Sequence, residues 1–195
     1  MSSMKLHRDP GVTQRTAWFM LHRLRSAWGE EAESEDYEGP VEMDETYIGG
    51  KERTKHASKR GKVGGGSGGK APVIGVKDRG TKQVSARVVE SSTKFEAMKA
   101  CEDHVALQAP VYTDYSPIHA DIPNRKSVNH SAGQYVNGDF RTNGIESFWS
   151  LFKRGSCGTY HKMSPKHLHR YVDEFTGRNN IRNHDTVVQI REWVA

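Results

Sequence analysis

The spacing of apolar residues predicts two short helices at the start of the chain, over residues 2–9 and 13–28, with Pro10-Gly11 between them. Thr13 stands where the N-cap of the second helix is expected. Along that helix apolar side chains recur every three or four positions and basic ones lie off the stripe: the apolar set is Ala17, Met20, Leu21 and Leu24, and the basic set is Arg15, His22, Arg23 and Arg25. Such a pair is typical of a helix-turn-helix, although any amphipathic helical pair shows the same pattern.

After residue 28 the pattern changes to an acidic stretch and then to alternating strands and helices. Residues 29–40 end in Glu38-Gly39-Pro40 and predict a linker at a domain boundary. The elements predicted beyond it are strands at 41–48, 72–77, 84–89 and 110–114, and helices at 93–107, 143–154 and 165–178, the last with Ser164 as N-cap and Pro165 in its first turn. Residues 115–140 predict irregular structure. This order predicts an α/β domain over 41–195, with a mixed sheet flanked by helices.

Composition excludes several classes of protein. At 195 residues the chain fits one domain with a small appendage, and it contains no apolar run of membrane-spanning length and no secretory signal. Its two cysteines, Cys101 and Cys157, lie far apart in sequence, which favours a reducing cytoplasm. We therefore expect a cytoplasmic protein without a membrane partner.

Charge is distributed unevenly along the chain, whose net charge is +5. Basic residues are concentrated in 1–25, 51–82 and 141–182, whereas residues 30–45 are acidic. A single charged run is usually solvated surface, but three basic blocks favour a nucleic-acid partner, and the glycine-rich stretch 49–70 predicts a mobile basic loop. The basic residues expected at the DNA are Arg15, Arg23, Lys59, Arg60, Lys62, Lys70, Lys153 and Arg154.

Three carboxylates are candidates for metal chemistry. Asp44 lies in one predicted strand and Asp114 ends another, where burial of a carboxylate is costly unless it binds something; an exposed edge acid or a cap is the alternative for each. In the helix over 143–154 the apolar face is expected on the sheet, which leaves Glu146 and, two turns later, Lys153 on the polar face. Two strands and a helix that each supply one carboxylate suit two Mg²⁺ ions and in-line phosphoryl transfer, with Lys153 on the DNA phosphates. A merely solvated Glu146 is the simpler alternative.

Several strings closely resemble the ISXO-like insertion-sequence transposases, which belong to the DDE superfamily, and together they cover nearly the whole chain. They are Val41-Glu-Met-Asp-Glu-Thr-Tyr-Ile-Gly-Gly50, Val111-Tyr-Thr-Asp114, Val128-Asn-His-Ser131, Arg141-Thr-Asn-Gly-Ile-Glu-Ser-Phe-Trp149, Phe152-Lys-Arg-Gly155, Gly158-Thr-Tyr-His161 and Ser164-Pro-Lys-His-Leu168. The resemblance implies a ribonuclease-H-like catalytic domain over 41–195.

The resemblance also implies an activity, namely strand cleavage and strand transfer of an insertion sequence, dependent on two Mg²⁺ or Mn²⁺ ions. Carried over residue by residue, it implies Asp44 and Asp114 as metal ligands, Glu146 as the third, and Lys153 near the DNA. Asn143 is a rival for the third position, because this branch is often described with Asn there. The implied partners are double-stranded DNA at the element ends and target, and further copies of the chain on that DNA, in a bacterial, nucleoid-associated cytoplasm.

The sequence departs from the family pattern in two places. Relatives usually carry a zinc ribbon before the helix-turn-helix, yet no Cys/His ligand set precedes residue 10, so residues 1–28 are expected to be a partial helix-turn-helix in a truncated copy. Residues 115–120 lack the Ala-Tyr pair expected after the second aspartate. Two alternatives therefore stay open: a catalytically inactive, DNA-binding repressor, and a ribonuclease-H-like nuclease without joining activity. Metal-dependent nicking distinguishes the repressor from either enzyme.

Overall fold

The chain forms two compact units, which are described separately. The first consists of residues 1–33 and 152–195, and the second of residues 34–151. The computed structural model describes residues 1–30, 36–50, 56, 58, 68–128, 142–185, 187 and 188. The DNA-binding segment 1–28, the linker 29–40 and the catalytic domain 41–195 remain a predicted division of function.

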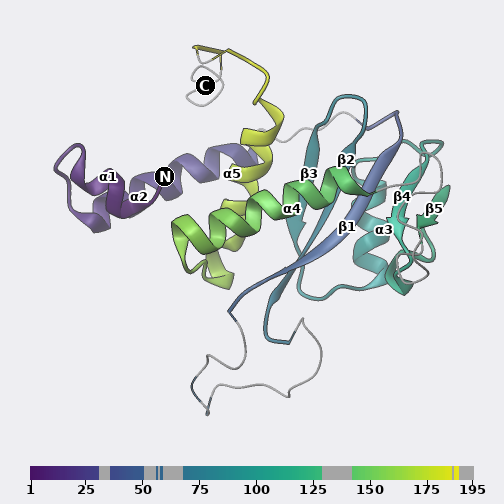
Figure 1. Cartoon of the computed structure of the whole chain (residues 1–195), viewed down its shortest axis with the longest axis horizontal. Coiled ribbons are helices and arrows are strands. Elements are labelled where there is room, and N and C mark those ends of the chain that lie inside the picture. The colour runs from purple at the N-terminus through teal and green to yellow at the C-terminus, as the bar shows by residue number, and fades with distance from the viewer. Residues whose placement is uncertain are drawn as a thin grey trace. The chain divides into compact units, whose positions relative to one another are not determined.

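The second unit is built on a five-stranded mixed sheet (Figure 1). Its strands are β1 (Val41–Ile48), β2 (Ala71–Asp78), β3 (Val84–Val88), β4 (Val111–Asp114) and β5 (Arg125–Val128), in the spatial order β3-β2-β1-β4-β5. β1, β2 and β3 are antiparallel neighbours, whereas β4 pairs with β1 and β5 in parallel. This mixed sheet with helices against it confirms the predicted α/β class.

Two helices pack on the sheet because alternate strand residues point to opposite faces. On one face Met43 and its neighbours form the core with α3 (Lys94–Glu102), which Thr93 caps by accepting from the Glu96 amide. On the other face lies α4 (Asn143–Gly155). A Cβ on Gly75 of β2 would come within 2.7 Å of the Trp149 ring, so a glycine at that position is what lets α4 approach the sheet.

The first unit contains α1 (Ser3–Arg8), α2 (Gln14–Glu30) and α5 (Leu168–Asn180). Both helices expected at the start of the chain are present, but the predicted apolar stripe of α2 is wrong in part. Met20 and Leu24 are exposed, whereas His22 and Arg25 are buried. The reason is a partner that local spacing cannot reveal: Glu174 on α5 forms an ion pair with Arg25 and so permits its burial.

Other boundaries differ from the predicted ones in small ways. α3 ends at Glu102 instead of continuing to 107, and β5 lies within the stretch expected to be irregular. Pro165 begins a 3-10 turn, Pro165–His167, ahead of α5, and Ser164 makes no side-chain capping bond there. None of the described helices combines the length and apolar character that crossing a bilayer requires.

Candidate active site

Asp44 and Asp114 come together because β1 and β4 run in parallel side by side. Met43 is opposite Thr113 in the register, so the two aspartates occupy the next position of adjacent strands and share a face. The pKa of Asp44 rises to about 7, because the partly buried carboxyl group is desolvated and lies near the charges of Glu45 and Asp114. The sheet therefore holds these carboxylates close enough to repel one another.

His119 links two of these acids at the end of the sheet. This histidine follows β4 in a 3-10 turn, Pro117–His119, and its side chain is fully buried. Its Nδ1 lies 3.1 Å from Asp114 Oδ1 and its Nε2 lies 3.2 Å from Glu45 Oε2, the second contact being an ion pair without hydrogen-bond alignment. Although burial opposes the charged form, the two carboxylates raise the pKa of His119 to about 9.

Asp114 is held in its charged form by its surroundings. Burial acts to raise the pKa of this carboxyl group, but the His119 hydrogen bond and charge outweigh it, together with a hydrogen bond that the Ser116 amide donates to Oδ1. The net result is a pKa below the ordinary value for aspartate. Asp114 is therefore ionised at neutral pH, beside an Asp44 that is only partly so.

The donor set fits a hard divalent cation. Among the described residues, Glu45, Asp114 and His119 offer ligand atoms that all lie within 4.8 Å of one another, and Asp44 is next to them. Carboxylate oxygens are the ligands that Mg²⁺ and Mn²⁺ prefer, and the raised pKa of Asp44 reflects its desolvation first and then the negative charges of Glu45 and Asp114. The carboxylates of this set could hold a divalent metal ion, whereas His119, protonated at neutral pH, has no free lone pair to offer one.

The candidates on α4 lie outside this donor set. Glu146 and Asn143 are exposed, and Thr142 Oγ1 donates to Glu146 Oε1 at 2.7 Å. Glu146 does not belong to the group of converging ligand atoms in the described part of the chain. The choice between Glu146 and Asn143 as third ligand therefore stays a prediction.

Among the described residues, most of the basic side chains expected to contact DNA are at the surface. Arg15 and Arg23 are exposed on α2, Lys153 and Arg154 are exposed on α4, and Lys70, just before β2, is partly buried. Lys59, Arg60 and Lys62 lie outside the described residues. Their contact with DNA remains a prediction.

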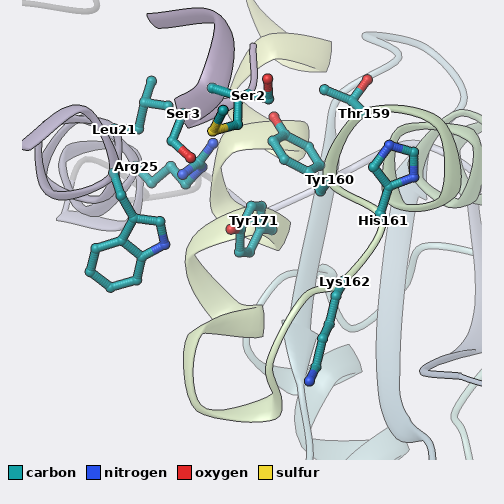
Figure 2. Close-up of a pocket in the computed structure, with 11 residues that line it drawn as sticks. Ser2, Ser3, Leu21, Arg25, Thr159, Tyr160, His161, Lys162 and Tyr171 are labelled. Carbon is teal, nitrogen blue, oxygen red and sulfur yellow. The ribbon is translucent and has the colours of Figure 1, made fainter. Parts of the chain in front are cut away.

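The first unit contains a pocket of about 320 Å³ between α1, α2, α5 and residues 159–162 (Figure 2). Its lining combines hydroxyl, basic and aromatic groups: Ser2, Ser3, Met4, Trp18, Leu21, Arg25, Thr159, Tyr160, His161, Lys162 and Tyr171. Arg25 donates from Nε to Glu174 Oε2 at 2.7 Å, and its guanidinium lies 4.4 Å from the centre of the Tyr171 ring. The basic side chain expected on the polar face of α2 is thus neutralised and buried by α5.

Sequence reasoning missed His119, Glu45 and Glu42. Glu45 follows Asp44 directly, but strand alternation assigns it to the opposite face. His119 lies in a stretch without periodicity, and the only local signal was its place five residues after Asp114. Glu42 belongs to the motif that begins at Val41, yet nothing in the pattern distinguishes a ligand from a structural acid.

We expect Asp44→Asn to stabilise the metal-free protein at high pH. The folded-state pKa of Asp44 is raised to about 7 from 3.8. Wild-type Asp44 therefore does not lower the free energy of unfolding below pH 4. It lowers that free energy increasingly between pH 4 and 7, and by the full amount above pH 7. The free energy of unfolding of the variant should exceed that of wild type by about 1–3 kcal/mol at pH 8. Each kcal/mol corresponds to a rise of ~2–4 °C in melting temperature. Thermal melts of both proteins in chelator at pH 4.5 and 8 measure this difference. An equal difference at both pH values would contradict the assignment.

Comparisons with known proteins give low similarity to retroviral structures. The HTLV-2 integrase catalytic core domain, solved in complex with magnesium in a trimeric form, is 14% identical with a TM-score of 0.42, and the match covers 79% of this chain and 92% of that one. A simian T-cell lymphotropic virus intasome in complex with the PP2A regulatory subunit B56 gamma is 12% identical with a TM-score of 0.43, covering 88% of this chain and 67% of that one.

Sequence comparisons give closer relationships. An uncharacterized protein in the transposable element ISH50 of Halobacterium salinarum is 30% identical over 193 residues; the match covers 92% of this chain and 65% of the relative's length. The family model for the ISXO2-like transposase domain matches residues 37–180, which include β1, β4 and α4 and therefore every carboxylate discussed above. The chain belongs to the ISXO2-like transposase domain family.

Proposed function

We propose that the chain is a DNA transposase that uses divalent metal ions to cut the ends of an insertion sequence and to join the freed 3′-hydroxyl to target DNA. The observation that supports this most directly is the pair Asp44 and Asp114 on adjacent parallel strands, with a raised pKa at Asp44. Such a pair of acids has little use in a protein that only binds DNA, because burial and mutual repulsion destabilise the fold.

Each residue of the site has a distinct part in this proposal. Asp44 and Asp114 hold the metal ions, and Glu146 or Asn143 completes the ligand set. His119 orients the Asp114 carboxylate through its 3.1 Å contact with Oδ1, while Glu45 holds the other side of the imidazole ring. Two Mg²⁺ or Mn²⁺ ions would supply an activated water or 3′-hydroxyl and stabilise the leaving oxygen.

The proposed partner is double-stranded DNA, with further copies of the chain on it. Arg15 and Arg23 are exposed on α2 and can reach phosphates or base edges, whereas Arg25 is bonded to Glu174 and His22 is buried against aromatic rings of the first unit. Lys153 and Arg154 add exposed positive charge on α4. Affinity should accordingly fall steeply with salt, as counterions are released from each neutralised phosphate.

Cleavage of end-containing plasmid tests the proposal. Supercoiled DNA with the element's ends is incubated with the protein in Mg²⁺, in Mn²⁺ and in chelator, followed by gel analysis of nicked and joined products. We expect nicking and joining with either metal and neither product in chelator. DNA binding without nicking would support the alternative that the chain is a DNA-binding repressor. Nicking without joining would support the alternative that it is a nuclease.

The third ligand can be identified by a ranking of two variants. We expect Glu146→Gln to lose more cleavage activity than Asn143→Ala, because a neutral oxygen balances the charge of two divalent ions poorly. Initial nicking rates at saturating Mg²⁺ measure both, and Ser150→Ala, an exposed residue one turn after Glu146 on α4, is the matched control. The opposite ranking would assign the third position to Asn143.

A further inference from the structure

A buried glutamate on β1 contacts the first turn of α4. Glu42 is 4% exposed, and its two oxygens have different partners. Oε2 accepts a hydrogen bond from the Ile145 amide at 2.9 Å, and Oε1 accepts one from Arg79 Nε, also at 2.9 Å. Glu42 therefore joins a strand to a helix that lies far away in sequence.

This contact replaces the usual local cap of a helix. The first amides of a helix lack intrahelical partners and usually receive a hydrogen bond from a side chain just before the helix. Here the hydroxyl of Thr142, at that position, is instead donated to Glu146 Oε1. A carboxylate from β1 binds the Ile145 amide and also complements the positive end of the helix dipole.

Two further contacts fix the same turn. Lys77 Nζ on β2 donates to the Gly144 carbonyl at 2.9 Å. A Cβ on Gly144 would lie 2.7 Å from Glu42 Oε2, so the backbone approaches the carboxylate as closely as a residue without a side chain allows. The turn is held from two neighbouring strands at once.

Arg79 compensates the charge of the buried Glu42. Its guanidinium lies 4.0 Å from the centre of the Tyr112 ring, and Tyr112 is the partner of Glu42 across β1 and β4. With one oxygen bonded to Arg79 and the other to a helix amide, Glu42 is poorly suited to bind a metal ion. Its role therefore lies in its contact with the first turn of α4.

We propose that Glu42 is a positioning residue for the cleavage site, which locks the first turn of α4 to the strand that carries Asp44; this inference rests on the proposed function. Glu42 and Asp44 are two positions apart on β1 and share a face. The locked turn contains both candidates for the third ligand, Asn143 and Glu146. One strand thus carries a metal ligand and the anchor for the helix that completes the ligand set.

The test compares Glu42→Ala and Glu42→Gln with a matched control. Glu42→Gln keeps the size and one acceptor oxygen but cannot neutralise Arg79, and it guards against loss of folding in Glu42→Ala. Asp78→Asn is the control, because Asp78 is equally buried at 4% exposure and also binds backbone amides, of Gly80 and Thr81 in the β2–β3 turn. All variants are assayed as the full chain.

The first readout does not depend on DNA cleavage. Hydrogen exchange of the first-turn amides of α4 should become at least about tenfold faster in Glu42→Ala, less so in Glu42→Gln, and should be unchanged in Asp78→Asn. The dissociation constant for Mn²⁺, measured by calorimetry, should rise most in Glu42→Ala, less in Glu42→Gln, and not at all in Asp78→Asn. Unchanged exchange or unchanged Mn²⁺ affinity in Glu42→Ala would overturn the proposal.

The second readout separates positioning from general stability. In Glu42→Ala we expect kcat for nicking to fall by about 100-fold while KM for DNA stays within about threefold, and Glu42→Gln should restore part of kcat. A kcat within threefold of wild type would overturn the proposal, as would an equal loss in Asp78→Asn. If wild-type protein binds Mn²⁺ but cuts no DNA, the proposed function fails. The rates of amide exchange in α4 and the Mn²⁺ dissociation constants of the variants then still decide whether Glu42 positions α4 for metal binding.

Discussion

Asp44→Asn and Asp114→Asn are each expected to reduce strand cleavage on the order of 10³-fold or more, while DNA binding is retained. Both acids are on adjacent strands, β1 and β4, and in the proposed site loss of one removes a metal ligand that acts on the transition state. Arg15 and Arg23, which are expected at the DNA phosphates, belong to the first unit and are not altered by either substitution. Nicking rates and binding titrations on the same end-containing duplex measure the two properties separately.

Asp121→Asn serves as the matched control for this pair. Asp121 is an exposed aspartate of the same unit that pairs with Lys94 at 3.0 Å, so its loss removes a charge without touching the site. Its nicking rate should stay within about twofold of wild type, because exposed ion pairs contribute little to stability. Wild-type nicking by either site variant would mean that the carboxylate site is misplaced.

Arg25→Met is expected to destabilise the first unit by about 3–5 kcal/mol, because it leaves Glu174 as a buried charge without its main partner. Arg25 and Glu174 are both less than a tenth exposed, and the Arg25 guanidinium also stacks on Tyr171. Tyr160 and Arg178 contact Glu174 as well, but Tyr160 is neutral and Arg178 is 57% exposed, so water screens its charge. Urea denaturation followed by circular dichroism measures the loss.

A double variant tests whether this penalty comes from the unpaired charge. Arg25→Met combined with Glu174→Met should be more stable than Arg25→Met alone, since no buried charge is then left uncompensated. Arg23→Met, an exposed arginine on the same helix, is the control and should change stability by less than about 0.5 kcal/mol. A loss in the double variant equal to the sum of the single losses would contradict this explanation.

The sequence predicted the elements whose pattern is complete within a short window. β1 to β4 and α4 follow from runs of β-branched residues and from a broad apolar helix face, and the structure confirms them. β5 was missed because Arg125-Lys126-Ser127-Val128 is mostly polar, and only its pairing with β4 makes it a strand. The buried face of α2 was wrong for a similar reason, since Arg25 is buried only through a residue on α5.

The same distinction applies to the candidate site. Asp44 and Asp114 could be named as candidates, because burial of a strand carboxylate is costly, but for each alone an edge acid or a cap stayed open and only the family resemblance implied a metal ligand. His119 could not, because its significance lies in two contacts, with Asp114 and Glu45, that form only in the folded sheet. Glu42 is the clearest case: both of its bonding partners, Arg79 and Ile145, come from other elements.

The parallel pairing of β1 with β4 also has a consequence for the order of folding. β1, β2 and β3 form a meander of sequence neighbours, whereas β4 follows only after the meander and α3. Contacts between distant segments close late, because the entropy of the intervening chain must be lost first. Asp44 and Asp114 therefore meet only when that long-range pairing forms, so a nascent chain that has folded its meander is still without the repulsive pair of acids. The repulsion between these two strands' acids is therefore deferred until the meander and α3 have formed the part of the core that can offset it.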